Sequence, residues 1–224
     1  MEADSLQVVR DTQAELGDAL KALRGQQRDG LTEAYVGYSA GHINRAVEGY
    51  VYLRESGRIE ASKLLVRAAL EPVLRIQAVR KKPELLFRIA FTEFQEDKKW
   101  VRPFNRPDTE DAIEAIDRQW EEFRRAYETK YPGQTLVEKE LSLRYAAELA
   151  GLDRYYDSHY RLYCRFTHAA FRASTGDLKE FETEDNRTMA LCAFAALEAV
   201  ASIGAPAPNM AALKRRVTSD DELS

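Results

Sequence analysis

Apolar residues recur along most of the chain at intervals of three and four positions, which is the spacing of an amphipathic α-helix. No stretch of alternating β-branched residues is long enough to predict a strand. Glycine and proline interrupt the helical pattern at intervals, as at Gly25, Gly57 and Gly151. The sequence therefore predicts an all-α, single-domain bundle of about seven or eight helices.

The interruptions divide the pattern into helices over about residues 4–24, 31–56, 59–82, 83–101, 108–131, 135–150, 152–174 and 184–203. The helix over 59–82 is apolar on nearly every side, so we expect it to be central and buried. Pro72 lies inside this helix and should bend it just after Glu71. The helix over 108–131 is amphipathic and should be peripheral. The helix over 184–203 is rich in alanine, which permits close packing inside the bundle, the favoured alternative, or across a dimer.

Two further features concern the C-terminal half of the chain. Thr135 and Glu138 have the spacing of a capping box, which predicts that they begin the helix ending near residue 150. The run Ala-Pro-Ala-Pro at 205–208 is followed by polar and charged residues. We therefore expect a helical bundle domain over 1–204 and a poorly ordered polar tail over 205–224.

Composition narrows the classes of function. The chain has 224 residues, enough for one sizeable core. Its formal net charge of −4 gives no general attraction to nucleic acid or membrane, so such binding requires a local basic patch. Cys164 and Cys192 show neither a disulfide framework nor the spacing of metal ligands. Since no export signal or membrane-spanning run is visible, we expect a cytoplasmic protein with no membrane contact, metal or cofactor.

The predicted helix over 152–174 carries a basic stripe. At about 100° per residue, one face presents Arg154, Arg161, Arg165, His168 and Arg172. The opposite face is aromatic and includes His159, which we expect in the core. Five potential cations on one face favour an anionic partner, such as the phosphates of RNA. The alternative is a solvated face, or arginines paired with acids of neighbouring helices, because the chain has 37 acidic and 33 basic residues.

Arg161 and His168 on this stripe have the chemistry for phosphodiester transfer without a metal. An imidazole can give or take a proton near neutral pH, and a guanidinium can stabilise a pentavalent phosphate by paired hydrogen bonds. The basic residues of the stripe that would then contact the RNA backbone are Arg154, Arg165 and Arg172. The alternative for His168 is a structural or solvent-facing histidine.

A second candidate set is Arg67 and Glu71, one turn apart on the predicted central helix. Their neighbours are apolar, so we expect buried charges that need partners. Either they form a structural ion pair, or Glu71 orients His168 or Arg161. His42, on the preceding helix, could join this polar cluster or be structural.

Two segments resemble the bacterial family called domain of unknown function 5677, over roughly residues 35–175: RAALE at 67–71 and YDSHYRLYCRFTH at 156–168. The resemblance places on family positions Arg67, Glu71, Tyr160, Arg161 and His168. Cys164 stands where the family usually has serine, so a hydroxyl donor is replaced by a weaker thiol donor. Arg67, Tyr160 and Cys164 are accordingly expected in supporting roles.

The spacing Arg161-x6-His168 is also similar to the Arg/His pattern of the higher eukaryotes and prokaryotes nucleotide-binding (HEPN) superfamily. This more distant resemblance implies a HEPN-like helical core. It also implies a dimeric, metal-independent ribonuclease of a toxin or antiviral-defence system.

Three functions remain open from the sequence. In the first, the protein is a metal-independent endoribonuclease with His168 as general acid and base, Arg161 stabilising the phosphate, and Glu71 assisting. In the second, it is a non-catalytic module that binds a nucleotide, a nucleic acid or an acidic partner through the basic face. In the third, it is an oligomerisation domain. The expected partners are RNA or another phosphate-bearing ligand, a second copy in a homodimer, and an antitoxin or effector protein.

Overall fold

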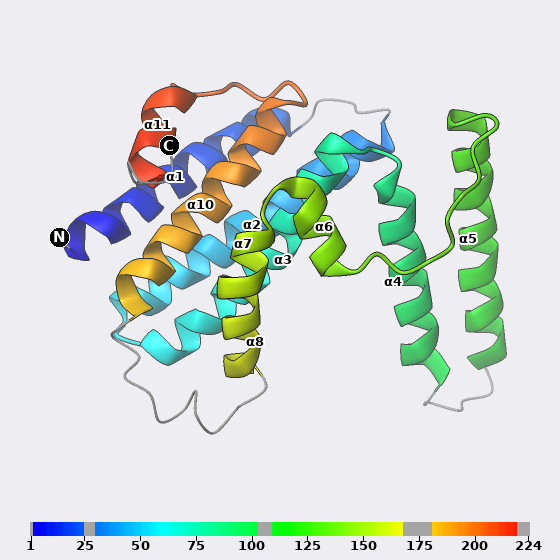
Figure 1. The fold of residues 1–224 in the computed structure, drawn as a ribbon, viewed down its shortest axis with the longest axis horizontal. Helices are drawn as coiled ribbons and strands as arrows, with labels where there is room; N and C mark the ends of the chain where they lie inside the picture. Colours follow the sequence, from blue (N-terminus) through cyan, green and yellow to red (C-terminus); the bar gives the residue numbers. More distant parts are fainter. Residues whose placement is uncertain (1, 25–29, 103–108, 168–180, 219–224) are drawn as a thin grey trace.

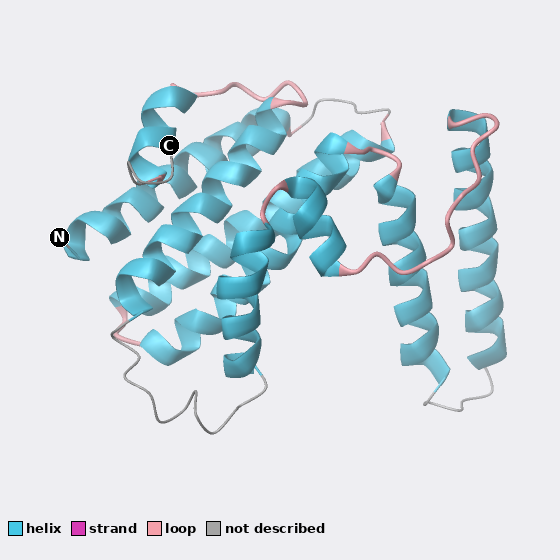
Figure 2. Ribbon diagram, in the orientation of Figure 1, coloured by secondary structure: helices cyan, strands magenta, loops and turns pink. Residues whose placement is uncertain are grey.

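The computed structural model describes residues 2–24, 30–102, 109–167 and 181–218. Every regular element in these ranges is helical, and none is a strand (Figure 2). The prediction of an all-α helix bundle is confirmed.

Four long helices form the centre of the fold: α1 (Glu2–Leu23), α2 (Leu31–Glu55), α3 (Ile59–Lys81) and α10 (Glu182–Ala201). Helix α10 packs against each of the other three (Figure 1). Nearly all of its alanine side chains are buried in the common core. The small residues of α10 therefore serve packing within one chain, which is the alternative favoured from the sequence.

Helix α3 is less completely buried than its apolar sequence suggested. Val66, Leu70, Val73 and Leu74 lie in the core, but Leu64 is 45% exposed. Helices α2, α10 and α6 (Leu143–Ala150) cover α3 from different sides. One stripe of α3 stays uncovered and faces a groove.

Helices α4 (Leu85–Val101) and α5 (Thr109–Lys130) form a hairpin that projects from the bundle (Figure 1). Aromatic side chains join the two helices, with Phe87 against Tyr127 and Phe94 against Trp120 at ring-centre distances of 4.9 and 5.8 Å. The peripheral position predicted for α5 is confirmed. The aromatic contacts compensate for the few contacts that this hairpin makes with the bundle.

The predicted capping box at Thr135 and Glu138 is wrong, because residues 134–142 lie outside any helix. Helix α6 begins instead after Ser142, whose Oγ accepts a hydrogen bond of 3.2 Å from the backbone N–H of Tyr145. The preceding loop is held against α4, since Arg88 donates to backbone carbonyls of residues 139 and 140. These contacts to a distant helix outweigh the local capping preference.

The predicted helix over 152–174 is interrupted by a π-helical turn. It consists of α7 (Asp153–Tyr155), the π-helix η2 (Tyr156–Tyr160) and α8 (Arg161–Thr167). Residues 168–174 of the prediction lie outside the described residues.

The expectation of a poorly ordered tail is wrong for helix α11 (Met210–Val217). The Asn209 side chain caps this helix by accepting from the backbone N–H of Ala212 at 3.1 Å. Leu213 and Val217 are buried in the core that α1 and α10 share. None of the described helices has the length and apolar character needed to cross a membrane.

Candidate functional site

The uncovered stripe of α3 is one wall of a groove of about 510 Å³. Its lining comes from α2 with Tyr35, Tyr38, Ser39 and His42, from α3 with Leu64, Arg67, Ala68, Glu71, Pro72 and Arg75, and from α4 with Glu93. The polar positions on α3 recur every three or four residues, so they share one face of that helix. We call this depression the polar groove.

Tyr160 of η2 joins the polar groove to a segment distant in sequence. The guanidinium carbon of Arg67 lies 5.6 Å from the centre of the Tyr160 ring. The Tyr160 hydroxyl donates to Glu71 Oε2 over 3.4 Å, and Glu71 Oε1 accepts from Arg75 Nη2 at 2.9 Å. A chain of polar contacts therefore links Arg67 and Glu71 on α3 with Tyr160 on η2.

The electrostatics of this chain follow from partial burial. Burial raises the pKa of Tyr160 to about 12, although the hydrogen bond with Arg67 works in the opposite direction. The same hydrogen bond is the main cause of a raised pKa of Arg67. Tyr160 therefore stays a neutral donor at physiological pH, beside a permanently charged guanidinium.

The prediction that Arg67 and Glu71 are buried charges is wrong, since both are only partly buried. Glu71 keeps 34% of its side-chain surface and pairs with Arg75 one turn further along α3. Whether Glu71 also orients Arg161 or His168 stays a prediction. His42 lines the same groove, as the sequence allowed.

The π turn alters the predicted basic stripe. A π-helix adds a residue relative to an α-helix and so rotates the following positions by roughly 100°. Because η2 lies between Arg154 and Arg161, these residues do not share a face in the way uniform α-helical spacing predicted.

Arg161 is 67% exposed and pairs with Asp157 at 3.7 Å. Cys164 is partly buried and close enough to contribute to the electrostatic environment of Arg67 and Tyr160.

The remaining positions of the predicted stripe fall beyond what the structure covers. The side chain of Arg165 and the whole of His168 and Arg172 lie outside the described residues.

His159 was expected in the core, but it is only partly buried and bonds Glu184 Oε1 at 2.6 Å through Nε2. The expected core position is therefore only partly correct, since polar contacts hold this ring.

Four residues of the polar groove were missed from the sequence: Tyr35, Tyr38, Arg75 and Glu93. Tyr38 is 74% exposed at the groove edge, and burial raises the pKa of Tyr35 to about 12. A signal was present, since Tyr38 precedes His42 by one turn and Arg75 follows Glu71 by one turn. From the sequence alone, these positions do not differ from an ordinary helix surface. The packing of α2, α3 and α4 brings them to one groove.

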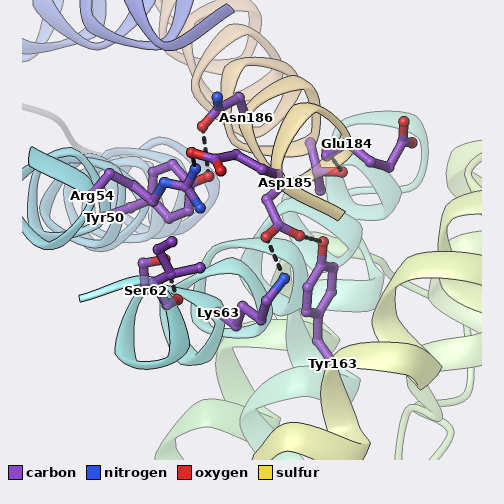
Figure 3. A network of polar contacts seen from close by, with 11 residues as sticks. Tyr50, Arg54, Ser62, Lys63, Tyr163, Glu184, Asp185 and Asn186 are labelled. Carbon is purple, nitrogen blue, oxygen red and sulfur yellow. Dashed lines mark hydrogen bonds and ion pairs between the residues drawn. The ribbon is translucent and has the colours of Figure 1, made fainter. Parts of the chain in front are cut away.

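A second polar cluster lies within the bundle and was also missed (Figure 3). Lys63 of α3 and Asp185 of α10 are fully buried, and Lys63 Nζ contacts Asp185 Oδ2 at 2.6 Å. Tyr163 of α8 donates its hydroxyl hydrogen to the other oxygen of Asp185. Nearby, the Tyr50 hydroxyl donates to Asn186 Oδ1 at 2.7 Å. Lys63, Asp185 and Tyr163, which we call the buried triad, tie α8 to α3 and α10.

The buried triad also bears on the polar groove. Tyr163 follows Tyr160 by three residues, so the contact that anchors α8 fixes the backbone next to the contact with Glu71.

Among the described residues, no group of three or more His, Cys, Asp or Glu side chains could hold a metal ion. The polar groove instead offers cationic and neutral donors, carboxylate acceptors and exposed aromatic rings.

The chain is similar to a known protein family. The model of a family of unknown function, DUF5677, matches residues 33–186. This range includes the polar groove, the π turn and Tyr160. No curated protein and no solved structure matches the chain.

Proposed function

The chain belongs to the DUF5677 family, whose function is unknown, and from that premise we propose that its polar groove binds single-stranded RNA through a phosphate. The observation that carries the proposal is the contact of Arg67 and Glu71 with Tyr160, which lies about 90 positions further along the chain. Residues on separate helices thus converge at the wall of one open groove.

Arg67 has the chemistry to bind a phosphate. Its guanidinium lies over the Tyr160 ring, and this contact orients its donors before a ligand arrives. Glu71 is paired with Arg75, so its negative charge is largely balanced within the site. His42 lies on the opposite wall and can donate a further hydrogen bond. A pre-oriented arginine beside a balanced ion pair favours an anionic ligand.

The aromatic residues favour a nucleic acid among anionic ligands. Tyr38 is 74% exposed on the groove edge, where water solvates much of its ring. Stacking of an unpaired base on such a ring contributes about 1–3 kcal/mol per base and tolerates any base. Proteins that bind single strands usually place basic side chains beside exposed aromatic rings, and Arg67 and Tyr38 line this groove together.

A second candidate function is metal-independent cleavage of the bound RNA. Arg161 directly follows Tyr160, is 67% exposed and, among the described residues, pairs with Asp157 at 3.7 Å, so its guanidinium is accessible to a phosphate. In this proposal His168 is the general acid and base, Arg161 stabilises the pentavalent phosphate, and Glu71 assists. Arg154, Arg165 and Arg172 then contact the RNA backbone. The function of a toxin or defence ribonuclease belongs to the same proposal.

Binding is tested by fluorescence anisotropy with a short labelled single-stranded RNA. We expect Arg67→Ala to weaken binding roughly tenfold, because a charged hydrogen bond to phosphate is lost. Arg80→Ala is the matched control, since Arg80 lies on the same helix, is exposed and does not line the polar groove. Equal affinities of wild type and Arg67→Ala at low salt would overturn the proposal.

Cleavage is tested by incubating wild-type and His168→Ala protein with total RNA and tRNAs in excess EDTA. New ends carrying cyclic phosphate with the wild type alone would support the ribonuclease. Binding without cleavage by either protein would leave the non-catalytic module. A homodimer and a controlling antitoxin or effector protein are further proposals, which sedimentation of the purified protein and co-purification would test.

A further inference from the structure

A second depression lies beside the polar groove, and we call it the apolar hollow. The hollow has a volume of about 280 Å³ and lies where α2, α4 and α5 meet, and it is lined by Leu31, Tyr35, Leu86, Ile89, Ala90, Glu93, Phe94, Asp97 and Phe123. Tyr35 and Glu93 line both depressions. The two depressions are therefore adjacent, with these two side chains at their common boundary.

The walls of the hollow are apolar and partly aromatic. Ile89 and Ala90 are buried at its base, and the rings of Phe94 and Phe123 lie with their centres 6.2 Å apart. Ligand sites for larger molecules usually have volumes of about 300–1,000 Å³. A hollow of 280 Å³ is therefore suited to a single ring system rather than to a helix or an extended peptide.

The charged groups of the hollow have one sign. Glu93 and Asp97 stand one turn apart on α4, and no lysine, arginine or histidine is among the lining residues. Ionised carboxylates only accept hydrogen bonds. The ligand that fits best is thus a flat apolar ring whose edge carries several donors.

We propose that the apolar hollow receives an unpaired base of the RNA bound in the polar groove, and that Glu93 and Asp97 select guanine. The inference rests on the proposed RNA binding. Guanine presents an N–H and an amino group side by side, which match the two oxygens of a carboxylate. Uracil presents one N–H between two carbonyl oxygens, which a carboxylate repels. Adenine and cytosine carry an amino group and should rank between them.

Arg75 connects the two depressions. Its guanidinium contacts Glu71 Oε1 at 2.9 Å and approaches Glu93 Oε1 at 3.9 Å. A cation of the polar groove thus lies within ion-pair distance of one carboxylate of the hollow, although it does not line the hollow itself. Glu93 and Asp97 lie on α4, whereas Arg67 lies on α3. Separate substitutions can therefore test the contact with the base and the contact with the phosphate.

The experiment compares labelled oligouridines that differ only at one central position, occupied by G, A, C or U. We expect the wild type to bind the oligomer with central G about tenfold more tightly than the one with central U. Salt should weaken both oligomers in parallel, with a slope near 0.7 per phosphate contact, and leave their ratio unchanged. Asp97→Asn should reduce the preference to within about twofold and leave binding of oligouridine unchanged, whereas Glu93→Gln, which also alters the polar groove, should reduce the preference to the same extent.

Glu96→Gln is the matched control, because Glu96 is an exposed acid of α4 that pairs with Lys99 and lines neither depression. Binding of all four oligomers with equal affinity would overturn the base site and leave the proposed RNA binding intact. Failure of every oligomer to bind would overturn the proposed function and the base site together. A preference for G that survives both α4 substitutions would also overturn the assignment to Glu93 and Asp97.

Discussion

The polar groove and the buried triad both involve residues of α3 and of the segment formed by η2 and α8, yet their environments differ. Lys63 and Arg67 are one turn apart on α3, and Tyr163 follows Tyr160 by three residues. In the triad, lysine and aspartate are fully buried and in contact at 2.6 Å. In the groove, the tyrosine hydroxyl contacts its glutamate over 3.4 Å, and the glutamate keeps a third of its exposure. One turn of helix separates a closed polar site from an open one.

This difference separates a role in stability from a role in binding. A fully buried charge has lost its water, so its partners must supply every hydrogen bond. A partly exposed charge retains water that a ligand can displace, and its pairing adds little to stability. We therefore expect substitutions in the triad to change the free energy of unfolding and substitutions in the groove to change affinity.

The largest effect is expected from Asp185→Ala. This change leaves the buried ammonium of Lys63 without its carboxylate, which should lower the free energy of unfolding by about 3–5 kcal/mol. Urea unfolding followed by circular dichroism measures the change. Glu71→Ala is the control from the groove and should cost at most about 1 kcal/mol. Comparable losses for the two variants would contradict the distinction between the sites.

The second prediction removes the whole triad with the variant Lys63→Met/Asp185→Leu/Tyr163→Phe. All charges and the hydroxyl are replaced by apolar groups of similar size, so no buried polar atom of the triad remains unsatisfied. Stability should return to within about 2 kcal/mol of the wild type or exceed it. A loss as large as that of Asp185→Ala would mean that the triad contributes more than the avoidance of a lone charge.

The outline of the fold could be predicted because it depends on local signals. The ends of α2 and α3 in the structure lie within one residue of the predicted ends. Glycine and proline end a helix through the backbone conformation at their own positions, so the sequence shows where they act. The start of α6 could not be predicted from Thr135 and Glu138, because the preceding loop bonds to α4 some 50 positions away. The order of α11 likewise depends on burial of Leu213 and Val217 against distant helices.

The candidate site was predictable only in part for the same reason. Arg67 and Glu71 were found from their spacing on one helix and Tyr160 from the resemblance to a family pattern, and the structure brings the three together. Lys63 could not be found, because a lysine in a helix is ordinarily solvated, and its partner lies 122 positions away. The face of Arg154 was misplaced because periodicity assumes uniform α-helix, whereas the chain inserts the π turn.

A third, smaller effect is expected from Tyr160→Phe. The substitution removes the hydroxyl, and with it the long hydrogen bond to Glu71 and the hydrogen bond with Arg67, but keeps the ring under the Arg67 guanidinium. The free energy of unfolding should fall by about 1 kcal/mol or less. Tyr163→Phe is the matched change in the buried triad and should cost more, because it leaves a buried carboxylate oxygen without its donor. Urea unfolding measures both losses, and equal losses would contradict the difference between the surroundings of the two tyrosines.

The smallest expected effect concerns pH and the residue next to the triad. The hydrogen bond from His159 lowers the pKa of Glu184, and the charges of His159 and Arg187 act in the same direction. An acid with a lowered pKa in the folded state stabilises the fold above its ordinary pKa of about 4.3. That contribution disappears as the pH falls through the lower, folded value. Because 44% of the Glu184 side chain is exposed, we expect a few tenths of a kcal/mol. The free energies of unfolding of the wild type and of Glu184→Gln should therefore differ at pH 6 and become equal near pH 3. A difference that stays constant with pH would show that His159 does not favour the ionised carboxylate.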